Sequence, residues 1–161
     1  MIFVTVGTHE QQFDRLVRGV DELKENGILT EPVFIQTGYS TYEPRHCECS
    51  PFVPFRQMKT LMTDADVVIT HGGPSSFIEA MAMGKVPVVV PRRGDLNEHV
   101  NDHQVDFVRV VAERQGDIVP VYDVAELAPA IERARELSRG VEFKSHNAEF
   151  CDELSRLIEG I

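Results

Sequence analysis

Cysteines are scarce in this 161-residue chain, and tryptophan is absent. The three cysteines, Cys47, Cys49 and Cys151, form an odd and sparse set, which fits a reducing compartment better than a disulfide framework. His46 lies beside the first two, as ligands do in some metal sites. The cluster nevertheless lacks the paired CxxC spacing of structural zinc sites, so we expect no metal ion there.

Clusters of basic residues and long apolar runs are also missing. The 16 Lys and Arg residues are outnumbered by 26 Asp and Glu residues, which gives a formal net charge of -10. This balance disfavours nucleic-acid binding, because contacts to phosphates need clustered Lys and Arg. Residues 1–6 are too short for a signal peptide and lack its basic start, and no stretch reaches the length of a transmembrane helix. We therefore expect a cytoplasmic protein that reaches a membrane only through a partner or a surface patch.

What the chain does contain is an alternation of short apolar segments with segments of helical spacing. The predicted strands are residues 2–6, 32–36, 52–53, 67–70, 86–90 and 118–121. The predicted helices are residues 13–26, 55–62, 74–83, 97–114, 124–137 and 142–158, and residues 39–51 are expected to form a loop. This alternation predicts an α/β fold with a Rossmann-like, doubly wound parallel sheet, in a single domain over residues 1–161.

Polar turns that contain glycine follow four of the predicted strands. They are residues 7–9, 36–38, 71–76 and 92–94. Ligands of doubly wound sheets bind at the carboxyl ends of the strands, and parallel strands bring those ends to one edge. We therefore expect the four turns to line a single polar cleft.

The turn at residues 71–76, HGGPSS, carries the strongest of these signals. Gly72 and Gly73 allow the backbone to approach a ligand closely. A helix that begins at Pro74 directs its free N–H groups and positive dipole end toward a phosphate, and Ser75 and Ser76 add hydroxyl donors. The alternative is a plain tight turn with a serine cap, for which the same residue types are common.

Two further features lie near this turn in the predicted fold. Glu79 has apolar neighbours, which indicates a largely buried helix, and a buried carboxylate needs partners such as the hydroxyls of a ribose. The alternative is a solvated carboxylate. Residues 97–104, NEHVNDHQ, gather hydrogen-bonding side chains at a predicted helix start, which suits the hydroxyls of a sugar. An exposed, capped helix start explains that composition equally well.

Other motifs carry less weight. Asp64-Ala65-Asp66 matches the metal-binding DxD of GT-A glycosyltransferases, but it falls at a junction between a predicted helix and a predicted strand. The chain has neither a GxGxxG nor a Walker A sequence, so the dinucleotide and P-loop classes are disfavoured.

Taken together, these segments resemble a known family. The run HGGPSSFIEAMAMGKVPVVVPR, followed by NEHVNDHQ, resembles the donor-binding signature of the C-terminal domain of glycosyltransferase family 28. The opening IFVTVGTHEQQFDRLV and the FIQTG segment resemble its small-subunit branch. That branch includes the donor subunit of the dolichol-linked N-acetylglucosaminyltransferase and subunits of bacterial exopolysaccharide and capsule transferases. The resemblance extends over residues 1–140 and implies a GT-B C-terminal, or donor, domain.

The resemblance also implies roles for particular residues. It assigns the uracil ring to the backbone around Phe55 and the ribose to Glu79. The catalytic base lies either on a second chain that binds the acceptor or on this chain, where His9 is the best local candidate for the base or for a diphosphate contact. No metal ion is expected, because the helix dipole stabilises the leaving diphosphate. Arg92 and Arg93 could pair with the carboxylate of a uronic acid, with the diphosphate or with solvent. The diphosphate contacts implied are Gly7, Thr8, His9, His71, Gly72, Gly73, Ser75 and Ser76, and the sugar contacts are Glu98, His99, Asn101, Asp102, His103 and Gln104. Arg92 is a further expected contact to the sugar nucleotide.

A complete GT-B enzyme has two such domains, and this chain matches only the donor type. The resemblance therefore implies a membrane-associated, acceptor-binding partner chain, and an inverting transfer of a hexose from a UDP-sugar to a polyprenyl-diphosphate-linked sugar, in exopolysaccharide or capsule synthesis. The alternatives are an N-acetylglucosamine transferase subunit of lipid-linked oligosaccharide assembly, a sugar-nucleotide epimerase and a non-catalytic nucleotide-binding module. Self-association of the isolated chain is also an expectation. The predicted helix 142–158 either docks the partner or merely covers the sheet, through Phe150, Leu154, Leu157 and Ile158.

Overall fold

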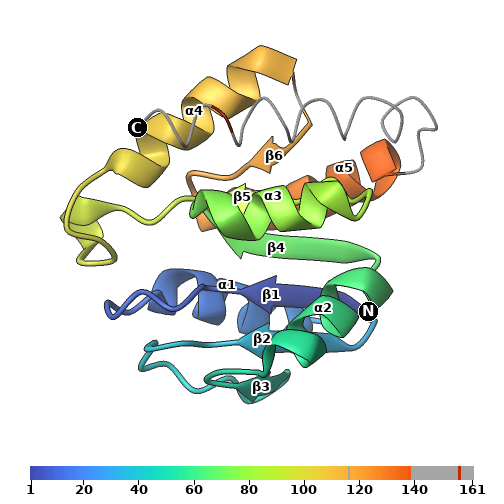
Figure 1. Cartoon of the computed structure of the whole chain (residues 1–161). Helices are drawn as coiled ribbons and strands as arrows, with labels where there is room; N and C mark the ends of the chain where they lie inside the picture. The colour runs from blue at the N-terminus through green and yellow to red at the C-terminus, as the bar shows by residue number, and fades with distance from the viewer. Residues whose placement is uncertain (116, 139–155, 157–161) are drawn as a thin grey trace.

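A computed structural model of the chain describes residues 1–115, 117–138 and 156 (Figure 1). Its strands are β1 (Ile2–Thr5), β2 (Val33–Gln36), β3 (Glu48–Ser50), β4 (Val67–His71), β5 (Val88–Val90) and β6 (Val119–Pro120). Its α-helices are α1 (Asp14–Glu25), α2 (Phe55–Asp64), α3 (Pro74–Ala82), α4 (His103–Gln115) and α5 (Leu127–Ser138). Two 3-10 helices, η1 (Gly94–Leu96) and η2 (Val124–Glu126), precede α4 and α5.

The strands form one parallel sheet in the order β3-β2-β1-β4-β5-β6. The chain winds outward from β1 in one direction and then returns to β4 and winds in the other, so the order reverses between β1 and β4. This is the topological switch point of a doubly wound sheet, at which such folds bind ligands. The arrowheads of β1 and β4 in Figure 1 point to the side of the molecule on which that site is expected. The predicted fold class is confirmed.

Helices cover both faces of the sheet, because side chains alternate along each buried strand. In β5, Val88 and Val90 pack with α1 and α5, whereas Val89 packs on the opposite face with α3 and α4. Phe3 of β1 lies on that opposite face too, against α2 and α3. Figure 1 shows α2 and α3 in front of the sheet and α1 behind it.

Two segments differ from the sequence-based expectation. The third strand is β3 and not residues 52–53; it pairs with β2 at the edge of the sheet, where Glu48 and Cys49 are exposed. A search for apolar runs overlooks an edge strand of this kind. The helix expected over residues 97–114 begins only at His103. Asn97 adopts a left-handed backbone (φ 58°), and the side chain of Asn101 accepts a hydrogen bond from the His103 N–H, so the preceding residues form a loop.

Several expectations concern features away from the cleft. The predicted helix 142–158, with Phe150, Leu154, Leu157 and Ile158, lies outside the described residues. No helix in the described part of the chain is long and apolar enough to cross a membrane. Within that same part, no three or more His, Cys, Asp or Glu side chains are placed to hold a metal ion. Burial raises the pKa of the Cys47 thiol to about 12, so this cysteine is protonated at neutral pH.

Candidate functional site

The four glycine-containing turns meet at the carboxyl edge of the sheet, as predicted. A Cβ atom placed on Gly38 would lie 2.8 Å from the carbonyl oxygen of Gly7, and one placed on Gly72 would lie 3.0 Å from Cα of Pro91. The side chain of Gln36 joins them further, because its amide donates to the carbonyl oxygens of Gly7 and Pro51. Gly7 and Gly38 adopt positive φ angles, 78° and 56°, which favour glycine. The backbone segments of these turns are therefore closely packed against one another at the carboxyl edge of the sheet.

The HGG turn is supported from below by His71. The imidazole is only 8% exposed; its Nδ1 accepts a hydrogen bond from the Gly73 N–H at 3.0 Å, and its Nε2 lies 3.2 Å from Oγ of Ser76. A Cβ atom on Gly73 would fall 2.1 Å from Cε1 of the ring, which no side chain tolerates. His71 therefore stabilises the conformation of the turn and exposes little surface to a ligand.

The N-terminus of α3 opens onto a cavity beside this turn. Pro74 occupies the first turn of the helix, and no side chain caps the helix at Gly73. Ser75 is exposed and Ser76 half-buried. An uncapped helix start offers N–H donors and a positive dipole end, which suit an anionic group. The adjacent cavity has a volume of about 530 Å³ and is lined by Gly72, Pro74, His99, His103, Gln104, Asp106, Phe107 and Val110.

Glu79 is half-buried on α3, whereas its apolar neighbours in the sequence had predicted a more buried position. The helix itself packs on the sheet through Phe77 and Met81, which leaves the Glu79 carboxylate access to solvent. Phe55 begins α2 with 69% of its surface exposed, and Nζ of Lys59 lies 4.8 Å from its ring centroid. Thr8 is exposed at the β1 turn.

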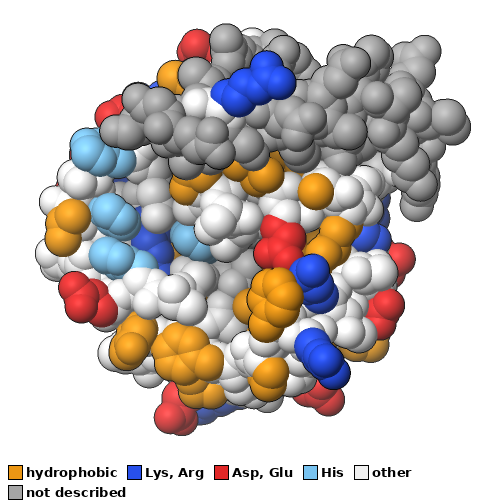
Figure 2. Space-filling model, in the orientation of Figure 1, with side chains coloured by type: hydrophobic (Ala, Val, Ile, Leu, Met, Phe, Trp, Pro, Cys, Tyr) orange, Lys and Arg blue, Asp and Glu red, His pale blue; other side chains and the backbone are white. Residues whose placement is uncertain are grey.

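Histidines gather at this edge of the molecule, where Figure 2 shows several imidazoles close together. The rings of His9 and His99 stack with centroids 4.5 Å apart and planes at 11°. Nε2 of His9 lies 2.8 Å from Oε1 of Gln11. Burial and the neighbouring charge of His9 lower the pKa of His99. The stack joins the turn after β1 to the loop after β5, which puts His9 within the candidate site.

Arg92 and Glu98, two of the expected ligand contacts, are bonded to groups of the protein in this structure. The Arg92 side chain is fully buried, and its guanidinium donates to the carbonyl oxygens of Val6, Gln11 and Glu98 at 2.7–3.0 Å. Burial lowers the pKa of Arg92 to about 10, so it stays charged at neutral pH. The Glu98 carboxylate is 1% exposed and is bound to the guanidinium of Arg15. Both side chains are occupied by groups of the protein.

Other members of the polar run fix loops to one another. Oε1 of Gln104 accepts hydrogen bonds from the backbone N–H groups of Gly72 and Arg92, so it joins the turns after β4 and β5. Asp102 accepts from the N–H of Gly94. His99 and His103 also line the cavity, and Nδ1 of His99 accepts a hydrogen bond from the backbone N–H of Asn101 at 3.4 Å. Arg93 forms an exposed ion pair with Asp95.

Sequence reasoning missed Arg15. It lies on α1 with its charged group directed under the loop after β5, 83 residues away in the sequence, where it binds Glu98 and the carbonyl oxygens of Pro91 and Tyr122. An arginine beside the apolar stripe of an amphipathic helix is a weak signal of such a role, because most arginines in that position are solvated.

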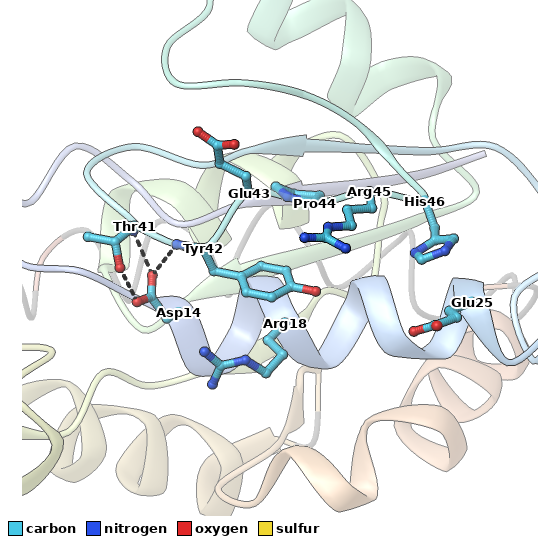
Figure 3. A pocket seen from close by; sticks show the side chains of 9 residues that line it. All are labelled: Asp14, Arg18, Glu25, Thr41, Tyr42, Glu43, Pro44, Arg45 and His46. Atoms are coloured by element: carbon cyan, nitrogen blue, oxygen red, sulfur yellow. Dashed lines mark hydrogen bonds between the residues drawn. The ribbon is translucent and has the colours of Figure 1, made fainter.

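A second cavity, of about 620 Å³, lies between α1 and residues 41–46 (Figure 3). Asp14 accepts hydrogen bonds from the backbone N–H and hydroxyl of Thr41, and the buried Asp21 accepts from the Tyr42 hydroxyl and the His46 N–H. Burial raises the pKa of Asp21, but these hydrogen bonds outweigh it and the pKa lies below its usual value. The lining mixes Arg18 and Arg45 with acidic groups, so it favours no ligand charge.

Folding stability is expected to fall on acidification because of His71. Burial lowers its pKa from 6.5 to about 3, so between these pH values the unfolded chain binds a proton that the folded protein excludes. The free energy of unfolding should then decrease by up to about 1.4 kcal/mol per pH unit as the pH falls below 6.5. His71→Asn should reduce this slope in urea titrations from pH 6.5 to 4.5, and any contribution from carboxylates is common to wild type and variant. His103→Asn, which removes an exposed imidazole, is the control; an unchanged slope in His71→Asn would contradict the assignment.

Comparison with known proteins agrees with this geometry. The family model for the glycosyltransferase family 28 C-terminal domain matches residues 1–138. The UDP-N-acetylglucosamine--N-acetylmuramyl-(pentapeptide) pyrophosphoryl-undecaprenol N-acetylglucosamine transferase of Bdellovibrio bacteriovorus is 30% identical over 80 residues, 48% of this chain and 22% of that enzyme. The glycotransferase of kitacinnamycin superposes with a TM-score of 0.61 at 21% identity, over 95% of this chain and 38% of that one.

A further solved structure, MurG of Acinetobacter baumannii, gives a TM-score of 0.51 at 17% identity, over 95% of this chain and 49% of that one. At these identities the solved structures show the fold alone. The chain spans less than half of either solved glycosyltransferase. With six parallel strands, a switch point between β1 and β4 and a family match over residues 1–138, the chain belongs to glycosyltransferase family 28 as a C-terminal domain.

Proposed function

We propose that this chain is the donor-binding part of an inverting glycosyltransferase that transfers a hexose from a UDP-sugar. The uncapped N-terminus of α3, beside the Gly72-Gly73 turn and a cavity of about 530 Å³, is the observation that carries the proposal. Helix N–H groups there would hold the diphosphate, and their dipole would stabilise the negative charge that develops on the leaving UDP. No metal ion takes part in this proposal.

Three other groups have proposed roles around the diphosphate. The Glu79 carboxylate would accept hydrogen bonds from the ribose hydroxyls, and the backbone at Phe55 would hold the uracil ring. The exposed hydroxyl of Thr8 lies in the turn that would contact the diphosphate from the β1 side. His9 is the local candidate for the general base, because its imidazole nitrogen can accept a proton and it lies in the turn after β1 at the carboxyl edge of the sheet.

The charges near the cavity favour a neutral sugar. Arg92 is fully buried by its bonds to protein carbonyls, and Arg93 is paired with Asp95 at 2.7 Å. The Arg92 guanidinium is therefore not available to the carboxylate of a uronic acid, and Arg93 would have to exchange its exposed partner Asp95 for it. His99 and His103 offer hydrogen bonds suited to hydroxyl or acetamido groups. Glucose, galactose and N-acetylglucosamine are the donors that this lining supports.

The acceptor half of the reaction is proposed to lie outside the described residues. The similar solved enzymes are more than twice the length that this chain covers, which supports an acceptor-binding part beyond the donor domain. We assign it to a membrane-associated partner that presents a polyprenyl-diphosphate-linked sugar, with this chain at the cytoplasmic face, in exopolysaccharide or capsule synthesis. Transfer of N-acetylglucosamine in lipid-linked oligosaccharide assembly is the second candidate, which the similarity to an undecaprenol-linked N-acetylglucosamine transferase favours.

Calorimetric titration with UDP and a panel of UDP-sugars tests the donor assignment. Glu79→Ala is expected to weaken UDP binding by about 10- to 100-fold, since a charge-assisted hydrogen bond contributes about 1.5–3 kcal/mol. Glu132→Ala, which removes an exposed carboxylate on α5, is the matched control and should bind as wild type does. Equal UDP affinity in Glu79→Ala and wild type would remove Glu79 from the site. Absence of UDP binding to wild type, with or without an acceptor partner, would overturn the proposed function.

A further inference from the structure

Two arginines bind the loop after β5, the fully buried Arg92 and the mostly buried Arg15, whose side chain is 17% exposed. Arg15 of α1 binds both carboxylate oxygens of Glu98, with Nε to Oε2 at 2.9 Å and a terminal nitrogen to Oε1 at 3.0 Å. Arg92 donates to the backbone carbonyl of the same residue at 3.0 Å. The side chain and the main chain of Glu98 are therefore fixed by separate guanidiniums, one from α1 and one from the end of β5.

The same two arginines tie this loop to the rest of the carboxyl edge. Arg15 also donates to the carbonyl oxygens of Pro91 and Tyr122, each at 3.1 Å, and Arg92 donates to the carbonyl oxygen of Val6 at 2.7 Å. The turns after β1, β5 and β6 thus share one buried polar network. Glu98 completes it by accepting from the backbone N–H of Arg93.

The residue that this network positions is His99. His99 follows Glu98 directly, stacks on His9 at 4.5 Å and lines the cavity beside the N-terminus of α3. One face of the loop is therefore anchored in the protein, while the other contributes to the cavity. A shift of Glu98 would carry the His99 ring with it, because adjacent residues share a peptide plane.

A mostly buried ion pair contributes little to the free energy of unfolding. Desolvation of the two charges offsets most of their attraction, and apolar residues of similar volume often stabilise a fold equally well. A planar guanidinium that grips both oxygens of a carboxylate does, however, fix a single geometry. The bidentate contact between Arg15 and Glu98 therefore suits a role in orienting the loop.

We propose that Arg15 and Glu98 are positioning residues that hold the His9–His99 stack in place to contact the sugar of the donor. In its reference to a sugar nucleotide the inference rests on the proposed function. Its geometric part, the dependence of the stack on the ion pair, does not. Neither side chain is placed against the ligand itself, since both act through His99.

The test replaces the ion pair by apolar residues in the full chain, as Arg15→Met/Glu98→Leu. A nuclear Overhauser contact between the imidazole protons of His9 and His99 is expected in wild type and is expected to vanish in this variant. Affinity for the tightest-binding UDP-sugar should fall at least tenfold, while affinity for UDP should stay within about twofold. The melting temperature is expected to fall, because the carbonyl oxygens of Pro91 and Tyr122 and the N–H of Arg93 lose these partners, so both affinities are compared at a temperature at which each protein is folded.

A second arginine–glutamate pair supplies the matched control. Arg135 of α5 binds Glu31, which precedes β2 at the amino ends of the strands, away from the cleft. Both side chains are about four-fifths buried. Arg135→Met/Glu31→Leu should preserve the imidazole contact and both affinities. A folded Arg15→Met/Glu98→Leu variant that keeps the contact and the preference for the UDP-sugar over UDP would overturn the inference.

Two outcomes are kept apart by this design. If wild type binds neither UDP nor a UDP-sugar, the proposed function fails, but the imidazole contact still decides whether the ion pair holds the stack. If the double variant does not fold, Arg15→Lys replaces it, because an ammonium keeps the charge but cannot grip both carboxylate oxygens. Arg15→Lys is expected to weaken the imidazole contact and reduce the preference for the UDP-sugar, and wild-type values for both would overturn the inference.

Discussion

Replacement of Arg92 by methionine is expected to lower the free energy of unfolding by about 3–5 kcal/mol, a large share of the 5–15 kcal/mol typical of a domain. The guanidinium is fully buried, stacks 4.9 Å from the ring centroid of Phe13, and donates to the carbonyl oxygens of Val6, Gln11 and Glu98. Methionine fills a similar volume but donates no hydrogen bond, so these carbonyl oxygens would remain buried without a partner. Urea unfolding at neutral pH measures the loss.

The neighbouring arginine provides the control for this prediction. Arg93 carries the same charge one residue later, but its ion pair with Asp95 is exposed, with 41% and 58% of the two side chains accessible. Exposed pairs contribute about 0–1 kcal/mol, so Arg93→Met should leave the unfolding midpoint nearly unchanged. Equal stability losses in the two variants would contradict the structural role assigned to Arg92.

Substitution of Gly73 by valine is expected to weaken UDP binding by about 100-fold or more. The valine Cβ would lie 2.1 Å from Cε1 of His71, a ring that is buried and bonded to the Gly73 N–H, so the turn itself has to shift. That shift moves the glycine N–H groups and the start of α3 away from the diphosphate. Loss of one or two charge-assisted hydrogen bonds, about 3 kcal/mol in all, corresponds to this factor.

Calorimetric titration with UDP gives the measurement, and far-ultraviolet circular dichroism checks that the variant is folded. Gly19→Ala is the control, because a Cβ atom there lies at an ordinary contact distance of 3.4 Å from Val124 and the position is on α1. It should bind UDP as wild type does. A folded Gly73→Val protein whose UDP affinity is within threefold of wild type would show that the HGG turn does not hold the diphosphate.

Much of the fold follows from local signals. Residues 67–70 were expected as a strand and form β4, which is apolar enough to be buried on both faces. The helix expected over residues 74–83 is α3, because Pro74 suits its first turn and Gly84, at φ 79°, ends it. The clustering of the glycine turns at one edge follows from the alternation of strands and helices, whereas the order of the strands does not, because doubly wound sheets of different orders share that alternation.

The errors occur where a residue's conformation depends on distant contacts. β3 is an edge strand whose pairing with β2, and not its own exposed residues, makes it a strand. Residues 97–102 form a loop because Asp102 accepts from the Gly94 N–H and because Gln12 donates to the carbonyl oxygens of Leu96 and Asn97. The helical propensity of residues 97–102 depends only on the residues themselves, so it does not predict a loop that is formed by these contacts.

The sequence alone determined that glycine turns follow parallel strands and that the HGG turn opens a helix, and these features suffice to recognise the family. Only the tertiary structure decided which polar side chains remain available at that edge. In the sequence, Arg92 and Glu98 are as suitable for binding a ligand as His99 and His103 are. In the structure Arg92 is fully buried and Glu98 is bound to the guanidinium of Arg15, whereas His99 and His103 line the cavity. The physical reason is that a charged group is buried only where a partner compensates its charge. The partner of Glu98 is Arg15, which lies 83 residues away in the sequence.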